Sequence, residues 1–149
     1  MKKVIVSMFF LLVLGASFAQ NTKEQIVADP RIVEVFGQET VDFYLKNNPT
    51  AIQYYNYFLE NSYNIQEIPQ EKMGDLQAIP ELKRKEKFQS DFIDYTDKGL
   101  ENLNIMKFDL KIDQNIGPIY RLGNTNKIIV FLSGSEFQTK FNKYIADLK

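Results

Sequence analysis

Residues 118–149 decide the fold, and they read PIYRLGNTNKIIVFLSGSEFQTKFNKYIADLK. Two runs of strand-forming residues, 118–122 and 127–132, flank the tetrapeptide GNTN. Glycine and asparagine tolerate the positive φ that hairpin turns require, so the pattern predicts an antiparallel hairpin. An even-length loop pairs Tyr120 with Ile129 and Ile119 with Val130.

Both faces of this predicted hairpin carry apolar side chains, so we expect it to lie between two layers. One face holds Tyr120, Leu122, Ile129 and Phe131, and the other holds Ile119, Ile128, Val130 and Leu132. The strand ends at Ser133, where Ser133 and Glu136 have the spacing of a capping box. The helix that follows has one apolar stripe that must dock, made of Phe137, Phe141, Tyr144, Ile145 and Leu148.

The N-terminus resembles a bacterial secretory signal peptide. A basic start at Lys2 and Lys3 precedes an apolar run over 4–14 and the small-residue motif ASFA, so cleavage is expected after Ala19. The alternative is an uncleaved anchor in the inner membrane, although the apolar run is shorter than the ~20 residues that span a bilayer. The protein is therefore expected in the periplasm or outside the cell. A lipoprotein is not expected, because no cysteine follows the apolar run to carry a lipid.

Residues 20–149 then form one small domain. Without Lys2 and Lys3 the chain has 16 basic residues against 19 acidic ones, a formal charge of −3. The one basic run, 83–87, is interrupted by Glu86 and is interpreted as a solvated face. Nucleic acid is therefore not an expected partner, and no membrane span is expected after cleavage.

The sequence of the N-terminal half of the domain predicts three helices. Asp29 and Pro30 open a short helix that ends at Gly37, and a second helix covers 38–47. Pro49 opens a third helix that reaches Ser62.

The middle of the chain is less regular. Residues 63–89 predict a wrapping loop with one edge strand at 63–68. Phe88, Phe92 and Tyr95 fit either a helical stripe or an extended segment. Residues 104–113 alternate apolar and charged side chains, which predicts a half-exposed strand. The expected fold class is α+β: a helical N-terminal half packed on a small C-terminal antiparallel three-stranded meander, followed by a C-terminal amphipathic helix.

The composition leaves little catalytic chemistry. The chain has no cysteine and no histidine, which removes disulfides, thiolates and imidazole ligands. Phosphate-binding and serine-nucleophile motifs are missing, and 113–117 fits a plain turn better than a calcium loop. No cofactor, metal site or catalytic residue is predicted. The remaining enzymatic alternative is a carboxylate-dependent hydrolase of cell wall or polysaccharide, with candidates Glu34, Glu39, Asp42, Glu60, Asp91 and Asp94.

The leading hypothesis is a non-enzymatic envelope or secreted protein that binds a protein or a glycan. Tyr54 and Tyr57 lie off the apolar arc of the third helix, where they could stack on a sugar or anchor a protein partner. The favoured alternative is that the 63–89 loop packs over both rings. A third hypothesis is an exported inhibitor that presents the turn at Asn115 or Asn124. The sequence predicts no oligomeric state.

Overall fold

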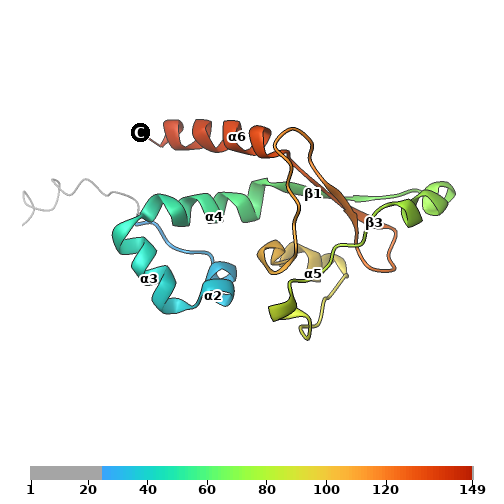
Figure 1. Cartoon of the computed structure of the whole chain (residues 1–149), viewed down its shortest axis with the longest axis horizontal. Helices are drawn as coiled ribbons and strands as arrows, with labels where there is room; N and C mark the ends of the chain where they lie inside the picture. Colours follow the sequence, from blue (N-terminus) through green and yellow to red (C-terminus); the bar gives the residue numbers. More distant parts are fainter. Residues whose placement is uncertain (1–24, 149) are drawn as a thin grey trace, which may run out of the picture.

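The structure is a computed structural model that describes residues 25–148. Its α+β class is confirmed: three helices lead into a three-stranded antiparallel sheet, and a helix closes the chain (Figure 1). The predicted signal peptide, 1–19, and its cleavage site lie outside the described residues. Within those residues, no helix is long and apolar enough to cross a membrane.

The three N-terminal helices begin and end where the sequence predicts: α2 (Pro30–Phe36), α3 (Gln38–Asn47) and α4 (Pro49–Asn61). The Asp29 carboxylate accepts a hydrogen bond from the backbone N–H of Arg31 at 2.8 Å and so caps α2. Gly37 separates α2 from α3 with φ 83° and ψ 154°. Prolines stand at the first positions of α2 and α4, where no intrahelical donor is lost.

The sheet has the strand order β1-β3-β2, with β1 (Tyr63–Glu67), β2 (Ile119–Arg121) and β3 (Lys127–Phe131). The predicted hairpin is confirmed in its register, because Tyr120 pairs with Ile129 and Ile119 with Val130. Gly123 supplies the positive φ, 55°, in the turn.

The two faces of the hairpin differ in burial. The face with Tyr120, Leu122, Ile129 and Phe131 is buried in the main core. On the opposite face Ile128 is buried but Ile119 is 42% exposed. The prediction of full cover on both faces is therefore wrong at Ile119, which lies on the edge strand.

The C-terminal helix α6 (Gly134–Asp147) carries the predicted capping box. The backbone N–H of Ser133 donates to the Glu136 carboxylate at 3.0 Å, and the Glu136 N–H donates back to the Ser133 hydroxyl at 3.3 Å. The helix α6 runs beside α4 in the opposite direction (Figure 1). Phe137 and Phe141 of its stripe are buried against aromatic rings of α4.

Residues 104–113 do not form the predicted strand, and this part of the meander is wrong. They contain the 3-10 turn η3 (Ile105–Lys107), which begins because the Asn104 side chain accepts the backbone N–H of Met106 at 3.2 Å. The remaining stretch makes one isolated bridge, between Phe108 and Arg84. The third strand of the sheet is β1 instead, at the position where the sequence predicts an edge strand.

Besides η3, the segment between β1 and β2 holds three short helices: η1 (Gln70–Ala78), η2 (Glu86–Phe88) and α5 (Asp97–Glu101). Phe88, Phe92 and Tyr95 form no helical stripe, and Phe92 is 88% exposed. Residues 80–82 cover part of the outer edge of β2. The N–H of Arg121 donates to the carbonyl of Pro80 at 2.9 Å, and the N–H of Leu82 donates to the carbonyl of Arg121 at 3.0 Å.

Candidate functional site

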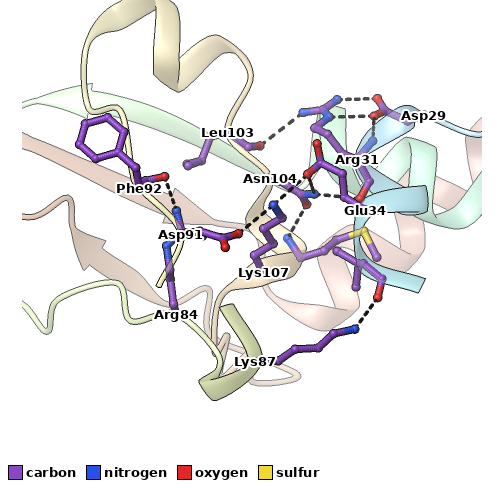
Figure 2. Close-up of polar contacts among 12 residues, drawn as sticks. Asp29, Arg31, Glu34, Arg84, Lys87, Asp91, Phe92, Leu103, Asn104 and Lys107 are labelled. Atoms are coloured by element: carbon purple, nitrogen blue, oxygen red, sulfur yellow. Dashed lines mark hydrogen bonds and ion pairs between the residues drawn. The ribbon is translucent and has the colours of Figure 1, made fainter. Parts of the chain in front are cut away.

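Two of the predicted acidic candidates meet at one lysine. Figure 2 shows the ammonium group of Lys107 between the carboxylates of Glu34, at 3.0 Å, and Asp91, at 3.1 Å. The Asn104 amide also donates to Glu34 at 3.1 Å and to the carbonyl of Arg31 at 2.8 Å. These contacts join α2 to the segment between η2 and η3, across a long stretch of sequence.

The charges in this cluster compensate one another. Partial burial raises the pKa of Glu34, but hydrogen bonds from Asn104 and Lys107 outweigh it and leave the pKa below its ordinary value of 4.5. A general acid in a glycosidase needs a raised pKa so that it holds a proton near neutral pH. The geometry therefore supports Glu34 as part of an ionic clamp and does not support it as a proton donor.

Of the other four acidic candidates, one lies near this pair and three lie elsewhere. Asp94 lines the same small cavity, of about 290 Å³, as Glu34 and Asp91. Glu39 and Asp42 lie exposed on α3, and Glu60 lies at the end of α4. Among residues 25–148 no group of three or more acidic side chains is placed to hold a metal ion.

Two carboxylates that form ion pairs, Asp29 with Arg31 and Glu34 with Lys107, should make the protein less stable in acid. The side-chain hydrogen bond from Arg31 is the main cause that lowers the pKa of Asp29 below 3.8. The pKa of Glu34 is likewise below its ordinary value. The unfolded chain therefore binds more protons than the folded one in this range, so stability rises with pH. The contribution is present above about pH 4.5 and is lost as the pH falls through the lowered folded-state values.

Because both carboxylates are partly exposed, we expect about 1 kcal/mol or less from each. Urea unfolding at about pH 7 and about pH 3 measures the difference. The combined variant Asp29→Asn and Glu34→Gln should be less stable at neutral pH and should show a smaller difference between the two conditions. An unchanged difference in the variant would contradict this assignment.

Tyr54 and Tyr57 lie half-buried beneath α6. The Tyr54 ring is 5.2 Å, centre to centre, from each of Phe137 and Phe141, and the Tyr57 ring is 4.8 Å from Tyr144. The expectation that the 63–89 loop supplies this cover is therefore wrong, since the rings stacked on them come from α6 and α4. A direct role of the two tyrosines in binding a partner stays a prediction.

The turn at Asn115 is held by hydrogen bonds to Asp113. The Asp113 carboxylate accepts the backbone N–H groups of Asn115, at 2.8 Å, and Ile116, at 3.1 Å. The carbonyl of Asp113 accepts the N–H of Gly134 at 2.8 Å, which fixes the turn to the start of α6. Ile116 is 72% exposed at its tip. The inhibitor hypothesis stays a prediction.

The outer edge of β1 is the most distinctive surface feature. Asn64 and Gln66 pair with Val130 and Ile128, and the flanking hydrogen bonds, from Leu132 to Ser62 and from Ile68 to Asn126, are at 2.8 and 2.7 Å. Hydrogen bonds alternate along an antiparallel strand, so the backbone groups of Tyr63, Ile65 and Glu67 point away from β3. Between residues 25 and 148 no backbone segment pairs with that side of β1.

An open groove of about 650 Å³ follows this free edge. The end of α4, β1 and α5 form its walls, and the side chains that line it are Arg31, Leu59, Glu60, Tyr63, Asn64, Ile65, Glu67, Asp97, Leu100, Glu101 and Lys127. The sequence predicted the edge strand. It did not predict the groove, because α5 reaches β1 only through tertiary packing.

Comparison of the chain with protein-family models, with curated proteins and with solved structures found no match.

Proposed function

We propose that the protein is a non-enzymatic binding module that takes an extended segment of a partner protein as an additional strand on β1. The observation that carries this proposal is the row of outward backbone groups on Tyr63, Ile65 and Glu67. Such groups are a template for a further strand, in which main-chain hydrogen bonds provide affinity and alternate side chains provide specificity. Because the N-terminus resembles a signal peptide, we expect this binding to take place outside the cytoplasm.

The two edges of the sheet differ in how they are protected. Proteins commonly block an edge strand with proline, with lysine, with a bulge or by covering it. Residues 80–82 cover part of β2. The sequence of β1, YNIQE, contains no proline, glycine or lysine, and its one charged residue, Glu67, stands at the end of the strand. An edge left open in this way supports a role in recognition.

Hydrogen exchange tests strand addition directly. Peptides are selected from a displayed random library against the purified protein, and amide exchange is then followed by NMR. In the free protein the amides of Asn64 and Gln66 should be protected, whereas those of Tyr63, Ile65 and Glu67 should exchange quickly. A bound peptide should protect the second group. Failure to select any peptide, or selected peptides that leave these three amides unprotected, would contradict the proposal.

A proline at position 65 should weaken binding without unfolding the sheet. The N–H of Ile65 points away from β3, so Ile65→Pro removes a donor that the folded protein does not use. We expect about tenfold weaker binding of a selected peptide, from the lost hydrogen bond and from the ring that blocks the edge. Titration calorimetry measures the affinity, and circular dichroism verifies the fold.

The matched control is Ile119→Pro. Ile119 also has an outward N–H on an edge strand, but on β2, at the other side of the sheet. This variant should bind the peptide as the unmodified protein does. Equal loss of binding in the two proline variants would place the peptide elsewhere.

A further inference from the structure

The acidic residues of the β1 groove exceed its basic ones. Glu60, Glu67, Asp97 and Glu101 line it together with two basic residues, Arg31 and Lys127. Both basic groups are already paired: Arg31 with Asp29 at 2.7 Å, and Lys127 with Asp97 and Glu67. Within the described part of the chain, Glu60 and Glu101 form no ion pair. Two exposed carboxylates beside the free edge are therefore in no ion pair, and Glu60 has only a longer-range attraction to Arg31, the smallest of the causes that raise the pKa of Arg31.

The position of Glu60 is unfavourable for the protein alone. It lies in the last turn of α4, which contains no basic residue, and the negative end of the helix dipole disfavours a carboxylate there. A local rule that is broken with little internal compensation marks a position that can serve recognition. A cation brought by a partner would add to the partial compensation that Arg31 provides.

The groove also provides apolar surface between these acids, from the half-buried side chains of Tyr63 and Ile65 on the strand itself. Leu59 and Leu100 line it as well but are almost fully buried. Side chains of an added strand alternate between its two faces. Every second side chain of the partner would therefore lie over the groove, where it meets either apolar surface or a carboxylate.

Resting on the proposed strand addition, we infer that the partner segment is basic: it presents lysine or arginine, interspersed with apolar residues, on the face toward the groove. A second copy of this chain fits less well as the occupant. Its β1 would bring Glu60 and Glu101 of its own to the junction, and like charges placed together oppose association. Charge complementarity therefore favours a different, basic protein.

Three short synthetic peptides test this inference. In each, threonine occupies one face, and the other face carries valine between two lysines, two glutamines or two glutamates. Slower amide exchange of Tyr63, Ile65 and Glu67 shows that a peptide has added to β1. The titration of the NMR signals of these residues gives its affinity. We expect the lysine peptide to bind about tenfold more tightly than the glutamine peptide, and its affinity to fall as salt is added.

Two double variants test whether Glu60 and Glu101 cause the preference for the lysine peptide. Glu60→Gln with Glu101→Gln should weaken the lysine peptide about fivefold, remove most of its salt dependence and leave the unfolding midpoint undiminished. The control, Glu39→Gln with Glu71→Gln, changes the net charge equally at exposed positions on α3 and η1 and should bind normally.

The outcomes separate the two proposals. If no peptide of any charge protects the outward amides, strand addition itself is wrong. If the glutamine or glutamate peptide binds as tightly as the lysine peptide, or if both double variants behave alike, strand addition stands and the basic partner is wrong. Protection that appears with protein concentration alone would mean that a second copy occupies the edge, which would overturn the inference.

Discussion

Phe108→Ala is expected to lower the free energy of unfolding by about 3–5 kcal/mol. Phe108 is 1% exposed and lies in the main core, and the guanidinium group of Arg84 stands 5.1 Å from the centre of its ring. Truncation would leave a cavity and would also remove the surface that covers a mostly buried charge, whose Nε atom already lacks a hydrogen-bond partner. Urea unfolding followed by circular dichroism measures the loss.

Ile112→Ala is the matched control for this change. Phe108 and Ile112 are equivalent in the alternating run of residues 104–113, so a regular strand would bury both on one face. In the structure Ile112 is 37% exposed, and its truncation should cost less than about 1 kcal/mol. Similar losses for the two variants would contradict the irregular path of this segment.

Gly37→Ala is expected to cost about 1–3 kcal/mol for a reason that involves no packing. Gly37 has φ 83° and ψ 154°, a region that essentially only glycine adopts. A methyl group added there would meet no atom within 4 Å, so the cost comes from the backbone alone. Thermal unfolding should show a lower midpoint together with unchanged helical content.

Gly74→Ala separates this backbone strain from a general effect of alanine. A methyl group at Gly74 also meets nothing within 4 Å, and its φ lies outside the positive region. Gly74→Ala should leave stability unchanged or raise it slightly, because alanine restricts the unfolded chain. A loss at Gly74 as large as that at Gly37 would mean that conformation does not explain the first result.

The parts of the fold that the sequence predicts well depend on neighbours within a few residues. The capping box joins Ser133 to Glu136, the hairpin turn needs Gly123, and Pro30 opens α2 after the Asp29 cap. In each case the hydrogen bond or the φ preference that decides the structure is contained in a short stretch. The register of β2 on β3 follows from the turn for the same reason.

The candidate site was only partly predictable. The edge strand at β1 was expected from its composition, but the groove needs α5 beside it. Glu34 and Asp91 were named as acids, yet nothing in the sequence placed both on Lys107, which the alternating pattern predicted to face solvent. Tyr54 and Tyr57 were correctly separated from the apolar arc of α4, but the helix that covers them was not identified.

The sequence by itself determined the boundaries of α2, α3 and α4, the start of α6, and the hairpin with its register, because short-range hydrogen bonds and backbone preferences specify them. Only the tertiary structure decided which segment completes the sheet. Residues 63–67 and 104–113 both have strand-like patterns, and the predicted meander puts 104–113 on the outer edge of β2. In the structure residues 80–82 take part of that edge, the Asn104 side chain starts a 3-10 turn, and residues 63–67 pair with the other side of β3. This arrangement leaves the outer side of β1 open, and which distant segment reaches which edge is not visible in local pattern.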